Sequence, residues 1–424
     1  MNQARKSAWN PSSPSTRVVK EEDLIHQLAW PGDWKAPLDV QLRASHAALD
    51  RLIRLGLPFR VDAGIRKFDP YEAIFFMRWA HHEFGDPLWI DAVKGIRDCA
   101  SEFLASKDGK ERFELTIRRE FNLEKRSPGS VFHAQIPRPP EDSDQHPLSI
   151  QIHEQAGVQG KQDNARLDLL VAVPPKLPRL RGYEFSVSFQ VGWRGAKIEP
   201  KRVRPFQPCS PEDLPFLASF EGPIRLTPPI QALARDLAGD SATPWDAIRS
   251  FWRFIFDRLT IGRIHPHTLD AEDPLSSTLK TGYSDCFFGS ALLAALCRSR
   301  GIPARLVSGY FLYRTCQTNH FWVEAKVPPY GWVPCDLWSW TLADGDLNHE
   351  MSELFLGQLD PRLVLERLPR QQMILDTFTD RPSYTLQRPL HAETQNPGVE
   401  IIQRDLAQDT LILRDQISLK KVEL

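Results

Sequence analysis

Residues 281–301 read TGYSDCFFGSALLAALCRSRG, and they predict how the central part of the chain is organised. Residues 287–297 are apolar on nearly every face, which predicts a helix buried in the centre of a domain. Either Ser284 or Asp285 can cap the start of that helix. Cys286 therefore falls in the first turn, where the helix dipole and the N–H groups favour a thiolate and can bind an oxyanion.

A β-hairpin is predicted downstream of this helix. Residues 319–327, NHFWVEAKV, alternate strictly between two faces and begin with His320 at the second position. A turn at residues 328–331 then sends the chain back along residues 332–338, which brings Asp336 near His320. A thiol on a helix N-terminus, a histidine and an aspartate supply the nucleophile, base and orienting group of thiol acyl transfer.

These segments resemble the transglutaminase-like superfamily, which shares a papain-like α+β core. The resemblance rests on pieces in a fixed order: Cys286, Gly301-Ile302-Pro303-Ala304-Arg305, His320-Phe321-Trp322-Val323-Glu324 and Gly331-Trp332-Val333-Pro334-Cys335-Asp336. It covers about residues 221–370, and FLGQLDPR at residues 355–362 looks like a segment found after the aspartate in bacterial members. The resemblance implies that Cys286, His320 and Asp336 are catalytic and that no metal or organic cofactor is needed.

The sequence departs from the family pattern at three positions. Glycine stands four residues before the cysteine, at Gly282, instead of two; Phe288 replaces a frequent polar residue, and Leu337 replaces a frequent proline. The three triad residues are intact, so the departures concern the substrate. The expected function is hydrolysis of an amide or peptide bond, as in a protease or amidase. Two alternatives stay open: an amide-forming acyltransferase of the transglutaminase type, and a catalytically idle module that binds a peptide or protein.

Composition narrows the range of partners. The 424 residues include 53 Lys and Arg against 54 Asp and Glu, a net charge of −1, which argues against a nucleic-acid partner held by phosphate contacts. No apolar run approaches the length of a membrane span, and residues 1–20 show no secretory signal. The six cysteines lack C-x-x-C spacing, which is typical of reduced thiols in a cytoplasmic protein. We therefore expect a peptide, protein or other amide-containing substrate; the oligomeric state is left open.

Five regions are expected along the chain, within an α+β fold. They are a disordered tail at residues 1–20, a helical accessory domain at 21–125, a small antiparallel β domain at 130–205, the catalytic core at 220–370 and a C-terminal extension at 371–424. The helical domain rests on cap signals such as Asp69-Pro70-Tyr71-Glu72. The β domain rests on period-two alternation at residues 148–153 and 184–191.

Several residues have a plain structural interpretation beside a functional one. Cys297 and Cys335 are expected in the core, and Cys316 in a loop. Trp322 and Trp332 can line a cleft or pack the sheet, and Glu324 can support the site or be solvated. Arg305 is expected to pair an acid beneath the site. The histidines at 265 and 267 and the group His81-His82-Glu83 lack companion ligands, so we expect no metal site.

Overall fold

The computed structural model describes the central core and parts of the two ends of the chain. The described residues are 19–28, 38–68, 111–122, 131–137, 145–153, 158–162, 166–172, 180–191, 194–195, 197–261, 270, 272–312, 319–337, 353–360, 362–367, 400–401 and 412–422. Within these ranges, no helix has both the length and the apolar character needed to cross a membrane.

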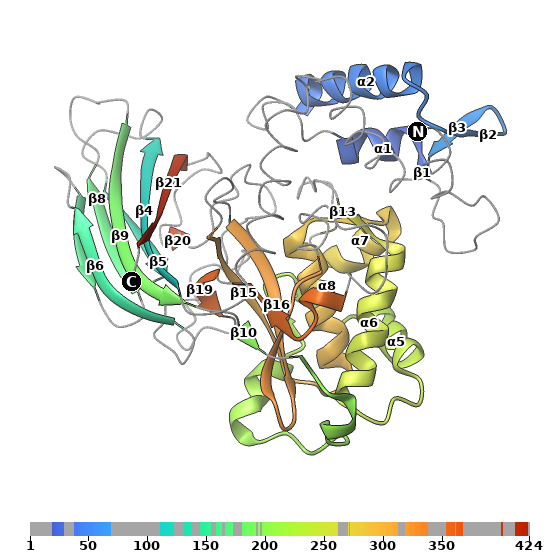
Figure 1. Cartoon of the computed structure of the whole chain (residues 1–424). Helices are drawn as coiled ribbons and strands as arrows, with labels where there is room; N and C mark the ends of the chain where they lie inside the picture. Colours follow the sequence, from blue (N-terminus) through green and yellow to red (C-terminus); the bar gives the residue numbers. More distant parts are fainter. Residues whose placement is uncertain are drawn as a thin grey trace.

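The core is a layer of helices packed on a four-stranded antiparallel sheet (Figure 1). The strand order is β17-β16-β15-β19. The strands are β15 (Ala304–Phe311), β16 (Asn319–Val327), β17 (Gly331–Cys335) and β19 (Arg362–Arg367). The helices are α5 (Pro228–Ala238), α6 (Pro244–Arg258), α7 (Pro274–Thr281) and α8 (Cys286–Ser299). Helix α8 packs on β15 and β16 and is surrounded by the other three helices.

The predicted central helix is confirmed as α8. Every residue from Phe287 to Arg298 is buried, as expected for a helix that is apolar on all faces. Of the two candidate caps, Asp285 is the one used: its Oδ1 accepts hydrogen bonds from the backbone N–H of Phe287 at 3.0 Å and of Phe288 at 2.9 Å. The first turn of α8 is therefore held by a carboxylate.

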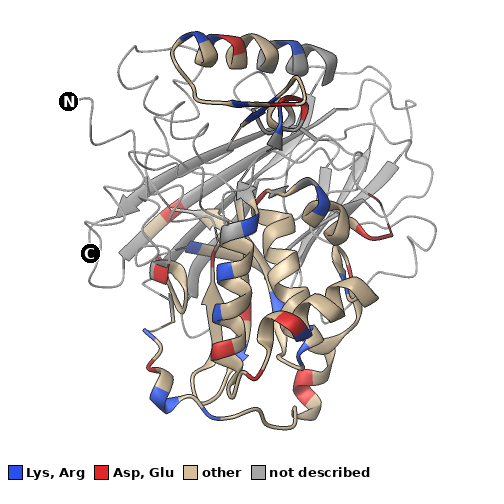
Figure 2. Ribbon diagram, turned by 90° about the vertical axis from the view of Figure 1, so that its right-hand side faces the viewer, with Lys and Arg blue, Asp and Glu red and all other residues tan. Residues whose placement is uncertain are grey.

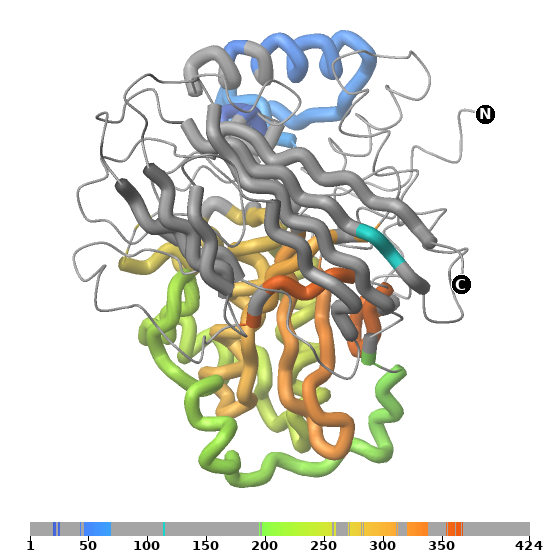
Figure 3. The backbone as a smooth tube through the Cα atoms, turned by 90° about the vertical axis from the view of Figure 1, so that its left-hand side faces the viewer, coloured from blue at the N-terminus to red at the C-terminus, as the bar shows by residue number. Residues whose placement is uncertain are grey.

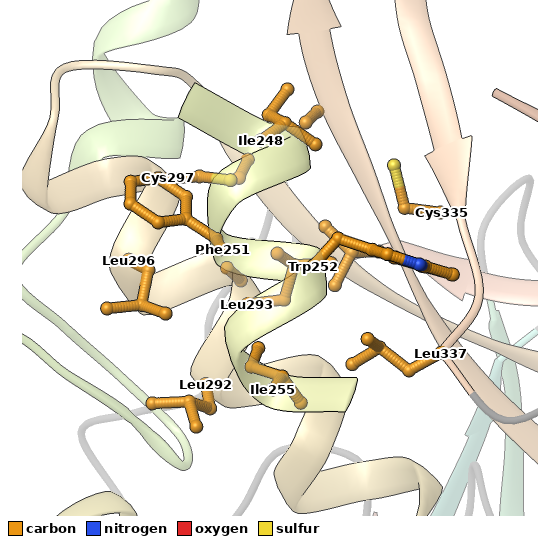
Figure 4. Packing of buried hydrophobic residues seen from close by; sticks show 14 of the residues in the cluster. Ile248, Phe251, Trp252, Ile255, Leu292, Leu293, Leu296, Cys297, Cys335 and Leu337 are labelled. Carbon is orange, nitrogen blue, oxygen red and sulfur yellow. The ribbon is translucent and has the colours of Figure 1, made fainter. Parts of the chain in front are cut away.

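Helices α6 and α8 meet in the centre of the hydrophobic core (Figure 4). Phe251 and Ile255 of α6 lie near Leu293 of α8 and its neighbours, whereas the ring of Trp252 extends in the opposite direction. Cys335 and Leu337 reach the same cluster from the strand on the far side of Trp252. The helical layer thus shares one hydrophobic core with the end of β17 and with Leu337.

Two further four-stranded sheets contain strands from distant parts of the chain. Their orders are β21-β4-β9-β6 and β20-β5-β8-β7. The strands are β4 (Glu111–Asn122), β5 (Val131–Pro137), β6 (Gln145–His153), β7 (Val158–Gln162), β8 (Arg166–Ala172), β9 (Leu180–Val191), β20 (Glu400–Ile401) and β21 (Ile412–Val422). The strands expected from alternation at residues 148–153 and 184–191 lie in β6 and β9.

The structure has strands in two regions where the sequence predicts none. Residues 111–122, expected at the end of the helical unit, form strand β4, because Phe113, Leu115 and Ile117 alternate with polar residues. The C-terminal extension contributes β21, which pairs along the length of β4, and β20, which pairs with β5. Each of the two sheets therefore has, at one edge, a strand from the C-terminal region.

The described N-terminal elements are two helices and a small sheet. They are α1 (Glu21–Leu28), α2 (Leu38–Arg54), β1 (Val19–Lys20), β2 (Arg60–Asp62) and β3 (Ile65–Phe68). Val19 and Lys20, expected in the disordered tail, pair with β3. The helices expected after Asp69 and Asp86 lie outside the described residues, and the domain boundaries stay predictions. Along the described helices, charged positions of both signs are interspersed with uncharged ones (Figure 2).

Candidate active site

His320 and Asp336 form a buried hydrogen-bonded pair. His320 is the second residue of β16, and Asp336 directly follows β17. The register pairs Val323 with Cys335, which is the hairpin that the sequence predicts. The His320 Nε2 lies 2.9 Å from Asp336 Oδ1 and 2.8 Å from Oδ2, and the two residues are 3% and 0% exposed. Because an ionised carboxylate only accepts hydrogen bonds, the Nε2 carries the proton in this pair.

Cys286 is the first residue of α8, and its side chain is partly buried. The residues next to Cys286 and His320 contact each other: the rings of Phe287 and Phe321 lie 4.9 Å apart in an edge-to-face arrangement. One turn further along α8, the Ser290 hydroxyl donates a hydrogen bond of 3.2 Å to the carbonyl of Phe321. The start of α8, which carries the thiol, and the start of β16, which carries the imidazole, therefore pack against each other.

The cap at Asp285 changes one expectation about the site. The sequence suggested that the N–H groups at the start of α8 would be available for an oxyanion. Two of them, those of Phe287 and Phe288, instead donate to Asp285 Oδ1. The positive end of the helix dipole still lies at Cys286, because the peptide units of α8 stay aligned.

Arg362 is the residue of this site that the sequence reasoning missed. Its Nη1 donates to Asp336 Oδ2, while its Nε and Nη2 donate to Asp360 Oδ1 at 2.9 and 2.7 Å. Arg362 and Asp360 are both 0% exposed. The one signal for them in the sequence is the segment FLGQLDPR, which contains both residues. His320, Asp336, Arg362 and Asp360 thus form a continuous buried chain of hydrogen bonds.

The remaining residues singled out from the sequence are structural. Glu324 is 5% exposed and accepts hydrogen bonds from Arg305 Nε at 2.7 Å and Arg367 Nε at 3.1 Å, so the solvated interpretation of Glu324 is wrong. Arg305 pairs with an acid, as expected, and also stacks on Trp332, 4.1 Å from the ring centre. Trp322 is fully buried against the sheet.

The other described thiols differ from Cys286 in their surroundings. Cys297 and Cys335 are buried in the core, and loss of solvation raises the pKa of each thiol well above its usual value. Burial, together with the charge of Asp213, also raises the pKa of Cys209. A thiol with a raised pKa is a poor nucleophile at neutral pH. Cys316 lies outside the described residues.

A metal centre is not apparent in the described part of the chain. No group of three or more His, Cys, Asp or Glu side chains gathers there at ligand spacing. The histidines at 265 and 267 and the group at residues 81–83 lie outside the described ranges, so the expected absence of a metal site stays a prediction.

Part of the chain is similar to known proteins in sequence and in fold. Residues 231–337 match the family model of the transglutaminase-like superfamily. A proposed cysteine protease from Cytophaga hutchinsonii has a similar fold, with a TM-score of 0.50 and 12% identity over 75% of this chain and 92% of that one. The periplasmic domain of TgpA from Pseudomonas aeruginosa aligns over 60% of this chain and 96% of that one, with 17% identity and a TM-score of only 0.28. No curated protein matches the sequence. Over residues 231–337, the chain is thus similar to the core of the transglutaminase-like superfamily.

Proposed function

We propose that the protein is a cysteine-dependent enzyme that transfers the acyl group of an amide or peptide bond to water. Cys286 is the nucleophile, His320 the general base and acid, and Asp336 the group that orients the imidazole. The observation that carries the proposal is the buried His320–Asp336 pair, which lies beside the start of the helix that begins with Cys286. Burying two ionisable side chains costs free energy unless they are hydrogen-bonded to each other. Buried pairs of this kind are typical of active sites.

The hydrogen bond to Asp336 assigns the two nitrogens of the imidazole. Because Nε2 donates to the carboxylate, Nδ1 is the nitrogen that takes the thiol proton. The Cys286 sulfur then forms a bond to the substrate carbonyl carbon, and Nδ1 returns the proton to the amine as the C–N bond breaks. Water next attacks the thioester while His320 takes its proton, and the acid leaves as the thiol is restored. The dipole of α8 stabilises the negative charge that develops beside Cys286.

The substrate class follows from this chemistry. A thiol nucleophile with an imidazole that can protonate a departing amine suits a peptide, a protein or a small amide. The Cytophaga hutchinsonii protein is named as a proposed cysteine protease, which is in line with that class. Amine transfer would require a site that admits an amine while keeping water from the thioester.

The test measures how fast the purified chain hydrolyses two kinds of substrate: an unfolded protein, and small acyl esters that react readily with thiols. We expect acid release by the wild-type chain, loss of release in Cys286→Ala and full release in Cys209→Ala, the matched control at a second partly buried thiol. Adding a primary amine at millimolar concentration separates the outcomes. Acid as the main product supports hydrolysis, amide as the main product at low amine identifies an acyltransferase, and no turnover with binding of peptide identifies an idle module.

A further inference from the structure

Asp336 lies between two groups that carry or can carry positive charge. On one side it accepts from His320 Nε2, and on the other from Arg362 Nη1. The Arg362 guanidinium is itself shared, because its Nε and Nη2 both donate to Asp360 Oδ1. A guanidinium presents its donors in a planar fork, so two carboxylates bound to two edges of that fork are fixed in position and orientation.

The net charge of Asp336, Arg362 and Asp360 favours a protonated imidazole at His320. Arg362 alone would offset the negative charge of Asp336 and weaken its support for a protonated imidazole. With Asp360 on the other side of the guanidinium, the three buried groups carry a net charge of −1. The imidazolium that forms when His320 accepts the thiol proton is then balanced, in a site where water does not screen the charges.

The segment that contains Asp360 and Arg362 is hydrogen-bonded to Asp336 and to the end of β17. The Asp336 N–H donates to the Phe355 carbonyl at 3.0 Å, and the Gly357 N–H donates to the Pro334 carbonyl at 2.9 Å. In Figure 3 the segment of residues 353–367, in red-orange, lies beside the strands of the core sheet. Arg362 belongs to β19 at one edge of the sheet, whereas Asp336 follows β17 at the other edge, so their ion pair connects the two edges.

The other described ionisable groups near His320 form ion pairs that do not include His320, or lie on α8 with Cys286, or are buried in the core. On the sheet, Glu324 binds Arg305 and Arg367, and Lys326 binds Asp213. On the helices, the described ionisable groups nearest the start of α8 include Asp285, which caps α8 through the N–H groups of Phe287 and Phe288, and Cys286. Further along the helices, Arg298 of α8 binds Glu221, and Arg249 and Arg253 of α6 bind Glu353. Cys335 of β17 lies in the core.

We propose that Arg362 and Asp360 are positioning residues for the reaction, which act through Asp336 by fixing its carboxylate and by setting how strongly it holds the imidazolium of His320. This inference rests on the proposed function, since it concerns the same histidine and aspartate. It goes beyond the triad by assigning a role to two buried residues that do not touch a substrate.

Two substitutions shift the titration of His320 in opposite directions. Asp360→Asn keeps an oxygen that accepts from Arg362 but removes one negative charge, so the imidazolium is less stabilised and loses its proton at a lower pH. The pair Arg362→Gln with Asp360→Asn removes one charge of each sign and leaves Asp336 without the nearer positive charge, so the imidazolium keeps its proton to a higher pH. We expect shifts of about 0.5 to 1 pH unit each way, from charges several ångströms apart in a medium of intermediate dielectric.

The measurement is a pH titration of the His320 ring by NMR of the full chain labelled with ¹⁵N-histidine. The background is Cys286→Ala, so that the thiol does not contribute, and the His320 signal is identified by its absence in His320→Ala. The matched control is Asp213→Asn, which neutralises another buried carboxylate that binds a cation, Lys326, on the same sheet; we expect that substitution to leave the titration unchanged.

The outcomes separate this inference from the proposed function. Opposite shifts in the two folded variants, checked by far-UV circular dichroism, support the inference. Unchanged midpoints, shifts in the same direction or loss of the fold in both variants overturn it, because the pair would then serve only stability. The proposed function fails separately, if His320→Ala leaves the alkylation of Cys286 unchanged in a chain that keeps its thiol.

Discussion

At the scale of single residues, the site depends on how one carboxylate is held. Asp336 accepts from His320 and Arg362 through its side chain and donates to Phe355 through its backbone. Its side chain is 0% exposed, so every one of these bonds lies in a region where an unmade bond to a charged group costs more than in water. The position of the imidazole is therefore fixed before any substrate arrives.

The substitution Asp336→Asn tests this arrangement. An asparagine amide can present either its oxygen or its N–H₂ to the histidine, and with the N–H₂ toward Nε2 the neutral imidazole takes the wrong tautomer. We expect kcat to fall by about 10³- to 10⁴-fold, with a smaller change in KM. Steady-state kinetics on an acyl ester check this. The control is Asp213→Asn, which should retain near wild-type turnover; wild-type rates in Asp336→Asn would mean that another group orients His320.

The sequence identified the three proposed catalytic residues but not the two behind them. Cys286, His320 and Asp336 could be found because each stands at a point that local rules define: a helix start, a strand of strict alternation and the return strand of a hairpin. Arg362 and Asp360 could not, because their partners are set by which strands meet at which edges of the sheet. Single-sequence periodicity carries no information about that order.

At the scale of elements, β15 and β19 approach each other closely around Gly309. A Cβ at this position would lie 1.9 Å from the Leu363 carbonyl oxygen and 2.7 Å from Cη2 of Trp322. The ring of Trp322 in turn lies 5.3 Å from the Arg362 guanidinium carbon. The glycine thus permits the contact between strands that brings Arg362 toward Asp336.

We expect Gly309→Ala to lower the free energy of unfolding by about 2–3 kcal/mol, because the strand or the tryptophan must move to admit a methyl group. Urea denaturation of the two chains measures the difference. Gly301→Ala is the matched control: its φ of +71° is unfavourable for alanine, but nothing lies within 4 Å of the added carbon, so the cost should be about 1 kcal/mol. Equal costs at the two positions would contradict the close contact.

An ion pair also ties α6 to the segment that precedes Asp360. Glu353 accepts from Arg249 at 2.9 Å and from Arg253 at 3.2 Å. Burial alone would raise the pKa of Glu353, but the hydrogen bonds and charges of the two arginines outweigh it, and the net effect is a lowered pKa. A carboxyl group with a lowered pKa in the folded state stabilises the fold above its unfolded pKa, and this contribution disappears as the pH falls through the folded value.

The substitution Glu353→Gln should therefore destabilise the chain at pH 7 by roughly 0.5 kcal/mol, a small value because the group is about one-third exposed and its charge is screened. The difference from wild type should shrink toward zero between pH 5 and pH 3, measured by urea denaturation across that range. Glu199→Gln, at an exposed pair 3.5 Å from Arg202, serves as the control and should show no such trend. A difference that grows as the pH falls would contradict the sign of the pKa shift.

At the scale of the whole molecule, strands that are neighbours in a sheet are in several cases far apart in the sequence. The helix-and-sheet core was foreseeable, since its segments are strongly patterned and consecutive. The two additional sheets could be predicted only in part. Alternation identified strands at residues 148–153 and 184–191, but β21 pairs with β4 across 291 to 310 residues of sequence, from Ile412 with Phe121 to Val422 with Arg112. Long-range strand pairing is decided by tertiary contacts that no local pattern records. The cytoplasmic location and the expected domain boundaries stay predictions.

The proposed mechanism requires His320 to activate the Cys286 thiol, and the alkylation rate of that thiol reports this activation. The measurement is the second-order rate constant for iodoacetamide at Cys286, followed by peptide mass spectrometry from pH 5 to pH 9 in the wild-type chain and in His320→Ala. Cys209 in the same chain is the internal control, because burial and Asp213 raise its pKa. We predict that at pH 6 Cys286 reacts at least ~10-fold faster than Cys209 and that His320→Ala abolishes the advantage. A Cys286 that reacts no faster than Cys209, or equally fast without His320, would contradict this mechanism.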